Sequence, residues 1–276
     1  MMRLILGTAQ LGLNYGIANA TGIPNAKDID QIFMICKNNG INYCDTAYAY
    51  GASHKLVKSR GIKIITKLSL GDPLKTKLEL EKLSSEFDGE ALDTVLVHNP
   101  KSLFDHPKNW EELQHLKQNN QFKIGVSVYT PQEAYELLNL QIVPDVIQIP
   151  YNIFDQKFDA ILPELKNLGI EIHARSLFLQ GLFFLNLSEI PKNIELLVNP
   201  MKVFNDFCNN DPSEKMKNAL HFVLHNQWID KLILGVEKPY QLLELIDCYN
   251  SYDGNISSFD YQFDDTQKHL LNPTNW

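Results

Sequence analysis

Residues 93–127, which read DTVLVHNPKSLFDHPKNWEELQHLKQNNQFKIGVS, show the pattern that decides the fold. A short β-rich run covers Asp93–His98, a segment with helical spacing covers Trp110–Lys117, and a second β-rich run covers Lys123–Ser127. Parallel strands need a long crossover, usually a helix, whereas antiparallel strands can be joined by a tight hairpin. We therefore interpret this stretch as one strand–helix–strand unit of a parallel sheet.

The same alternation extends along the whole chain of 276 residues. The predicted strands are Arg3–Thr8, Ile41–Asp45, Lys63–Lys67, Asp93–His98, Lys123–Ser127, Asp145–Ile149, Ile170–Arg175 and Lys231–Val236. The predicted helices are Asp28–Asn38, Leu74–Phe87, Trp110–Lys117, Pro131–Leu140, Phe158–Leu168 and Glu214–Asn226, with a short one at Ser53–Arg60. Eight such units predict an α/β fold, a (β/α)8 TIM barrel that forms a single domain over residues 1–276.

A doubly wound open sheet is the alternative fold. It would need a glycine-rich turn after the first strand to hold a pyrophosphate. The first predicted strand instead runs into Gly7-Thr8-Ala9-Gln10-Leu11-Gly12, which lacks that fingerprint. The barrel is therefore favoured.

Two regions lie outside the alternation. The connection from Leu177 to about Asn199 is long for a compact domain, and such connections are usually lids or binding loops. Residues 257–276 are polar with scattered aromatics, and we expect this C-terminal tail to pack over one end of the barrel.

The bulk composition argues against two classes of partner. The formal net charge is −8, and the basic residues are spread out rather than gathered in the stripe that nucleic-acid binding needs. No stretch approaches the ~20 apolar residues of a membrane helix, and the apolar run in residues 1–7 is too short for a signal peptide. We expect a cytoplasmic protein that binds neither nucleic acid nor membrane.

The four cysteines, Cys36, Cys44, Cys208 and Cys248, include no C-x-x-C pair, and we expect reduced thiols and no metal site. Cys44 directly precedes Asp45 and could be read as a nucleophile. Neighbours on a strand face opposite ways, so we expect Cys44 to pack outward under a helix.

Polar residues stand at the carboxyl end of every predicted strand, where barrel active sites lie. Taken singly, Asp45 could be a turn residue, Lys67 a solvated flank and His98 a satisfied core histidine. Together, three ionisable residues on consecutive strands predict a site at one mouth of the barrel. The strand-end residues in order are Thr8, Asp45, Lys67, His98, Ser127, Gln148, Arg175 with Ser176, and Glu237 with Lys238.

The segment Asp45-Thr46-Ala47-Tyr48-Ala49-Tyr50-Gly51, with Lys67 in IITK and His98 in VLVHNP, resembles the aldo-keto reductase superfamily. That family's signature is an Asp, a Tyr five residues later, a Lys that ends the next strand and a His that ends the one after. The resemblance covers nearly the whole chain and implies an NAD(P)-dependent oxidoreductase. The catalytic residues that it implies are Asp45, Tyr50, Lys67 and His98.

The chemistry of carbonyl reduction needs this set of side chains. Hydride delivery to a carbonyl carbon builds negative charge on the oxygen, which a proton donor must absorb. A free phenol holds its proton until about pH 10, and a nearby ammonium such as that of Lys67 favours the phenolate. Asp45 would pair with Lys67, and His98 would orient the carbonyl. Tyr48 competes with Tyr50 for the acid role, but the family spacing favours Tyr50 and places Tyr48 in the pocket wall.

The resemblance also implies where NADP or NAD would bind. Ser127 and Gln148 would hold the carboxamide, Thr8 would approach the nicotinamide ribose, and Glu244 would lie near the adenine. Backbone N–H groups of Ser176 to Gly181 would face the pyrophosphate. The cofactor-binding residues expected on this basis are Thr8, Ser127, Gln148, Arg175, Ser176, Leu177, Gln180, Gly181, Glu237, Lys238, Gln241 and Glu244.

Three positions depart from the family pattern. Val128 stands where the family often has Asn, and Gln241 stands at the usual Arg position near the adenosine 2′ group. Glu237 would repel a 2′-phosphate whereas Lys238 would attract it, so the choice between NAD and NADP stays open.

Arg175 takes the place of the aromatic residue that commonly stacks on the nicotinamide. A cation there predicts a bias towards reduced cofactor or contact with an anionic substrate. The alternative is a salt bridge from Arg175 to Glu171 or to a loop acid.

The predicted function is NAD(P)H-dependent reduction of an aldehyde, ketone or sugar carbonyl, or the reverse alcohol oxidation, with a small-molecule carbonyl substrate as partner. A catalytically weak, cofactor-binding regulatory or sensor protein on the same barrel is the alternative, and a phosphate-binding barrel of unrelated chemistry is a third. The oligomeric state stays open. The resemblance leads us to expect a barrel without the family's usual N-terminal floor hairpin, whose floor large inward side chains or another chain would close. Aromatic and imidazole groups for substrate contact would come from Phe104, His106, Phe178, Phe183, Phe184, Tyr261 and Trp276.

Overall fold

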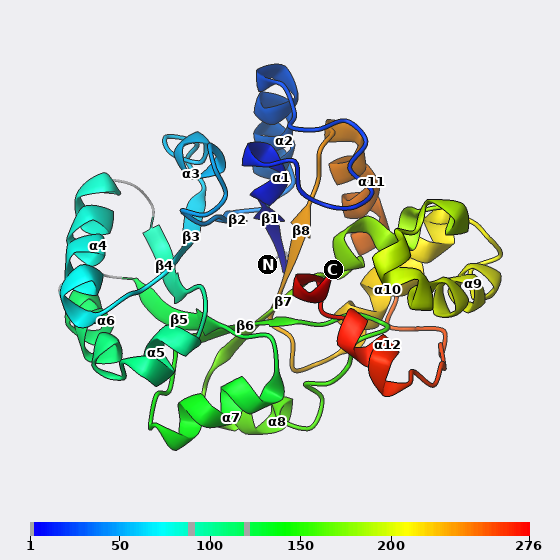
Figure 1. Ribbon diagram of the computed structural model, residues 1–276. Coiled ribbons are helices and arrows are strands. Elements are labelled where there is room, and N and C mark those ends of the chain that lie inside the picture. Colours follow the sequence, from blue (N-terminus) through cyan, green and yellow to red (C-terminus); the bar gives the residue numbers. More distant parts are fainter. Residues whose placement is uncertain (1–2, 88–91, 119–121) are drawn as a thin grey trace.

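The computed structural model describes residues 3–87, 92–118 and 122–276. Eight parallel strands form a closed barrel in which each strand pairs with the next and β8 pairs with β1 (Figure 1). This confirms the (β/α)8 barrel and excludes the open sheet. The strands are β1 (Leu4–Gly7), β2 (Tyr43–Asp45), β3 (Lys63–Leu68), β4 (Leu92–Val97), β5 (Lys123–Ser127), β6 (Val146–Pro150), β7 (Glu171–Arg175) and β8 (Lys231–Gly235).

Helices surround the barrel and lie between successive strands (Figure 1). The α-helices are α1 (Ala9–Gly12), α2 (Ala26–Asn38), α3 (Ser53–Leu56), α4 (Pro73–Glu86), α5 (Lys101–Asp105), α6 (Lys108–Gln118), α7 (Pro131–Asn139), α8 (Leu162–Asn167), α9 (Val198–Phe207), α10 (Pro212–His225), α11 (Pro239–Asn250) and α12 (Asp265–Leu270). Short 3₁₀ helices are η1 (Leu179–Phe184), η2 (Leu187–Glu189), η3 (Lys192–Leu197) and η4 (Pro273–Asn275). Over the described residues, none of these helices is both long and apolar enough to cross a membrane.

Helix α11 is absent from the prediction, although its signals stand in the sequence. Pro239 lies in the first turn, where its missing N–H costs nothing, and the buried Leu242, Leu245 and Ile246 recur at spacings of three and one. The predicted helix Phe158–Leu168 is shorter in the structure, because α8 begins at Leu162 with Pro163 in its first turn.

Alternate strand residues face the helices and the barrel interior, as the pleat of a strand requires. Cys44 is fully buried in the outer layer with Ile32 and Cys36 of α2, as predicted. The inner layer contains Ile5 and Ile65, together with Leu96 and Val146.

Paired charges and an aromatic ring fill the amino-terminal end of the barrel. The Lys231 ammonium lies 3.8 Å from the centre of the Tyr43 ring and 2.7 Å from Glu171. Glu171 also accepts from Lys123. Large inward side chains therefore close this floor, which was the first of the two predicted solutions.

The connection after β7 is not an open loop. It folds as η1, η2 and η3 and leads into α9, around a second apolar cluster in which Phe154 lies 4.9 Å from Phe183 and 5.4 Å from Phe204. Phe259 from the C-terminal tail stacks on Phe154 at 5.5 Å. The tail and this connection thus form one packed layer beside the barrel.

Candidate active site

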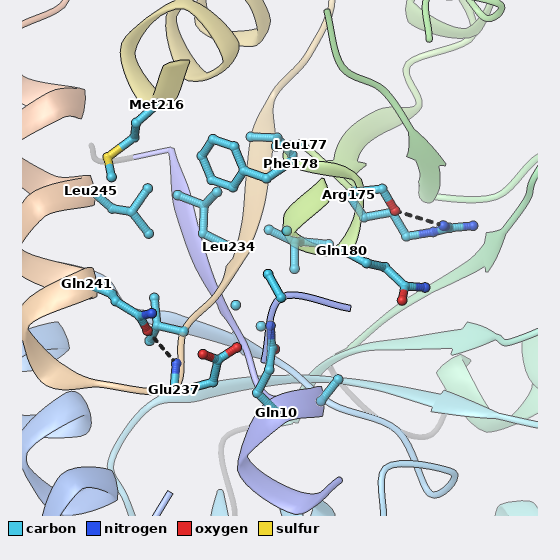
Figure 2. Close-up of a pocket in the computed structure, with 18 of the residues that line it drawn as sticks. Gln10, Arg175, Leu177, Phe178, Gln180, Met216, Leu234, Glu237, Gln241 and Leu245 are labelled. Atoms are coloured by element: carbon cyan, nitrogen blue, oxygen red, sulfur yellow. Dashed lines mark hydrogen bonds between the residues drawn. The ribbon is translucent and has the colours of Figure 1, made fainter. Parts of the chain in front are cut away.

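A cavity of about 790 Å³ opens at the carboxyl ends of the strands (Figure 2). Strand-end side chains form one end of it, and α10, α11 and the segment after β7 form the other. The predicted site residues that line it are Thr8, Asp45, Tyr50, Lys67, His98, Ser127, Gln148, Arg175, Ser176, Leu177, Gln180, Gly181, Glu237, Gln241 and Glu244.

The end of the cavity formed by the strand-end side chains is the catalytic end. Lys67, which projects inward from β3, contacts other charged and polar groups of this end. Its side chain is only 1% exposed, and its ammonium donates to the Asp45 carboxylate and, at 3.3 Å, to the Tyr50 hydroxyl. Burial by itself would lower the pKa of Lys67, but the Asp45 carboxylate and Tyr50 outweigh it, so the pKa is raised. Lys67 therefore stays charged while in contact with the phenol.

The backbone around Tyr50 is held by two glycines that permit a close approach. A Cβ on Gly12 would lie 2.1 Å from the Tyr50 carbonyl oxygen, and a Cβ on Gly51 would lie 2.6 Å from the Gly12 carbonyl oxygen. Gly51 also has a φ of 58°, a value that glycine adopts at little cost. Helix α1 can thus pack directly against the turn that carries the phenol.

His98 completes the catalytic end. Its ring lies edge-on to the Tyr50 ring, with 6.0 Å between the centroids. Burial, and then the charge of Lys67, lowers the pKa of His98 to about 4. The imidazole is therefore neutral near neutral pH and carries one N–H for a hydrogen bond.

Gln148 links this group to the neighbouring strands. Its amide nitrogen donates to Asp45 at 2.9 Å, while its buried carbonyl oxygen has no hydrogen-bond partner among the described residues. Ser127 lies beside it in register on β5. An unpaired buried acceptor is costly, so this oxygen is suited to an N–H donor from a ligand such as a carboxamide. Thr8, by contrast, uses its hydroxyl on the Asp45 carbonyl oxygen and on Ser53.

Arg175 does not form the alternative salt bridge with Glu171. Its guanidinium lies 4.1 Å from the centre of the Tyr129 ring and donates to the Val128 carbonyl oxygen at 3.1 Å. Glu171 lies at the floor of the barrel, where it binds Lys123, Lys231 and His173. No carboxylate within the described part of the chain lies within ion-pair distance of Arg175, although its side chain lines the cavity.

Two other residues predicted to lie at the site do not line the cavity. Lys238 does not line the cavity, because its ammonium turns to Asp28 of α2 at 2.9 Å. Tyr48 is not in the pocket wall, because its hydroxyl donates to Glu86 at 2.6 Å and its ring packs on His54. In both cases a carboxylate on a neighbouring helix binds the side chain, and sequence spacing does not reveal such a partner.

A strained segment after β7 meets the loop after β1. Ser176, Leu179 and Gln180 all have positive φ values, of 62°, 44° and 55°, which non-glycine residues rarely adopt. The Gln180 carbonyl oxygen accepts from the backbone N–H of Ile17 at 3.0 Å. The segments that follow β1 and β7, the two strands on either side of β8, thus touch at the edge of the cavity.

Several lining residues carry no signal in the sequence. Figure 2 shows Phe178, Met216, Leu234 and Leu245 grouped together, away from Arg175 and Gln180. Met216 comes from α10 and Leu245 from α11, whereas Leu234 lies on β8 and Phe178 follows β7. The lining residues that were not predicted include Gln10, Tyr15, Tyr129, Glu214, Met216, Lys217, Leu245, Asp247 and Cys248.

Known proteins resemble this chain in both sequence and fold. The sequence model of the Aldo/keto reductase family matches residues 3–260. An aldo-keto reductase from Bacillus halodurans in its holo form superposes with a TM-score of 0.71 at 18% identity, over 98% of this chain and 91% of that one. A glycerol dehydrogenase from Gluconobacter oxydans superposes with a TM-score of 0.67 at 22% identity, over 98% of this chain and 90% of that one. Comparison with curated protein sequences gives no match.

Proposed function

This chain belongs to the aldo/keto reductase family, and we propose that it reduces the carbonyl group of an aldehyde, ketone or sugar with NADH or NADPH, using Tyr50 as the proton donor. The family match makes the chain an oxidoreductase, and the family generally uses a nicotinamide cofactor. The substrate, the cofactor and the residue roles are the proposal. The same groups would serve the reverse oxidation of an alcohol.

The contact between Lys67 and Tyr50 carries the proposal. A buried ammonium 3.3 Å from a phenol oxygen stabilises the phenolate that remains once the phenol has given up its proton. Asp45 holds this ammonium on its other side and balances its charge. A polar rim does not require a buried lysine beside a tyrosine that faces the cavity, so this pair favours a catalytic role.

The proposed reaction places one proton and one hydride on the carbonyl group. When bound, a reduced nicotinamide cofactor supplies the hydride for the carbonyl carbon. The Tyr50 hydroxyl donates its proton to the carbonyl oxygen as negative charge develops there. His98, neutral because its pKa is about 4, can donate a hydrogen bond to the same oxygen and orient it.

The chain's own groups fit such a cofactor. The unpartnered carbonyl oxygen of Gln148 can accept from a carboxamide N–H, with Ser127 beside it. The strained segment from Ser176 to Gly181 lines the cavity, where its backbone can approach a pyrophosphate.

A turnover assay tests the proposal. Purified protein is mixed with NADH or NADPH and a panel of aldehydes, ketones and sugars, and loss of the near-ultraviolet absorbance of the reduced cofactor is followed. Tyr50→Phe is expected to lower kcat by about 10²–10⁴-fold, the usual contribution of a general acid. Tyr48→Phe is the matched control and is expected to keep kcat, because Tyr48 lies outside the cavity. Undiminished turnover in Tyr50→Phe, or tight cofactor binding with no turnover on any carbonyl, would contradict the proposal.

A further inference from the structure

The far end of the cavity has an acidic wall. Apart from Asp45, the acidic residues that line the cavity are Glu214 of α10, Glu237, and Glu244 and Asp247 of α11. Lys217 is the basic residue in this part of the lining, and its ammonium lies 3.8 Å from Glu214. The other two cationic side chains of the lining, Lys67 and Arg175, belong to the catalytic end.

The groups that could attract a phosphate at this end are engaged elsewhere. The ammonium of Lys238 pairs with Asp28 outside the cavity, at 2.9 Å. The backbone N–H of Glu237, which precedes α11, donates to the side-chain oxygen of Gln241 at 2.8 Å (Figure 2). The backbone N–H of Lys238 donates to the same oxygen at 2.9 Å. A phosphate at this helix end would therefore meet carboxylates and occupied donors.

The cavity is also large enough for more than a small carbonyl compound. Its volume of about 790 Å³ lies well within the range of pockets that hold drug-sized ligands. Phe178, Met216, Leu234 and Leu245 give the far end an apolar wall against which a flat purine can pack (Figure 2). A dinucleotide whose carboxamide reaches the unpartnered oxygen of Gln148 would thus place its adenosine half against the acidic wall.

We propose that this site selects NAD(H) against NADP(H), with Glu237 and Glu244 as the residues that discriminate. The proposal rests on the nicotinamide-dependent function proposed above. The two cofactors differ in a 2′-hydroxyl, which can donate to a carboxylate, and a 2′-phosphate, which carries close to two negative charges. Like charges in a partly enclosed cavity repel, so the carboxylates favour the hydroxyl.

The environment of Glu237 agrees with this assignment. Burial raises the pKa of its carboxyl, and Gln241 and the charge of Lys238 offset the rise only in part. A hydrogen bond from a neutral 2′-hydroxyl would stabilise this carboxylate, whereas a 2′-phosphate would repel it.

Direct binding tests the selection without any need for turnover. The dissociation constants of NADH and NADPH are measured by calorimetry for the whole protein at one ionic strength. We expect NADH to bind at least about tenfold more tightly, a difference of ~1.4 kcal/mol. In Glu237→Gln and in Glu244→Gln, we expect NADPH affinity to rise several-fold while NADH affinity changes little, so the ratio narrows.

Lys238→Ala is the matched control. Lys238 lies next to Glu237 in the chain, but its ammonium pairs with Asp28 outside the cavity, so this variant should keep the wild-type ratio. Equal or tighter binding of NADPH by the wild type overturns the selection, and so does a selective loss of NADPH affinity in Lys238→Ala. Failure of both cofactors to bind the wild type would instead refute the nicotinamide-dependent function itself.

Discussion

The two ends of the cavity are built in different ways. At the catalytic end, Asp45, Lys67 and His98 come from the ends of β2, β3 and β4, three neighbouring strands of one barrel. At the far end, the wall comes from α10, α11 and the segment after β7. Polar side chains near this wall, such as that of Lys238, pair with residues on nearby helices. Parallel strands in register bring their ends together whatever the loops do, whereas helix and loop side chains depend on packing that short sequence patterns do not encode.

The largest expected effect falls on the catalytic end. Lys67→Met removes the ammonium beside Tyr50 and leaves the Asp45 carboxylate buried without its cation. We expect kcat to fall by at least about 10²-fold, and the free energy of unfolding to fall by about 3–5 kcal/mol, the usual cost of breaking a buried pair. Turnover and urea denaturation measure the two effects.

The double variant Lys67→Met with Asp45→Leu separates these two roles. Removing both charges should restore part of the stability and none of the activity. Restored turnover in the double variant would show that the pair is structural and that Tyr50 works without it.

The second effect is a dependence of stability on pH through His98. Its pKa is about 4 in the folded protein, against about 6.5 for an unfolded histidine. The unfolded chain therefore binds the proton first. The contribution to stability is complete above about pH 6.5 and is lost as the pH falls through about 4. It amounts to at most about 3–4 kcal/mol.

Urea denaturation of the wild type and of His98→Gln between about pH 7 and pH 4 tests this linkage. The difference between the two proteins isolates His98 from other buried histidines such as His54 and His173, whose pKa values are also lowered by burial. Parallel curves over the whole range would show that His98 does not titrate as the structure implies.

A smaller effect is expected at Arg175, which belongs to the catalytic end of the cavity. Its cation should disfavour the positively charged oxidised nicotinamide relative to the reduced form. Arg175→Leu should therefore shift the ratio of the two affinities by about three- to tenfold towards the oxidised cofactor, a modest shift because the side chain is partly exposed. Arg175→Lys keeps the charge and should keep the ratio, and an unchanged ratio in Arg175→Leu would rule out the bias.

The smallest effect is expected at Gln241. Gln241→Ala removes the side chain that accepts from Glu237 and Lys238 at the start of α11. The loss of such a helix cap costs about 1 kcal/mol, which thermal unfolding can detect. NADH affinity is expected to change less than twofold, roughly, since the cap serves the helix. A large loss of affinity would mean that Gln241 itself binds the cofactor.

Much of the catalytic end could be predicted from the sequence, and less of the far end. Asp45, Lys67 and His98 end apolar strands, and Tyr50 stands at a fixed spacing in the turn after the first of them, so the order of the barrel brings all four to one cavity. Lys238 was predicted to face the cofactor, but in the structure it pairs with Asp28, on a helix more than two hundred residues away in the chain. Tyr48 was misplaced for the same reason, since its partner Glu86 lies on α4.

The sequence by itself determined that this protein is a parallel barrel with an Asp–Tyr–Lys–His group at the carboxyl ends of its strands. It could do so because strand periodicity, strand order and residue type are local properties that the closed sheet converts directly into position. Tertiary structure alone decided which charges face the ligand. The free energy of a side chain depends on the partners within a few ångströms, and those partners come from distant parts of the chain. In this protein no carboxylate among the described residues lies within ion-pair distance of Arg175, and Lys238 is turned away from an acidic wall.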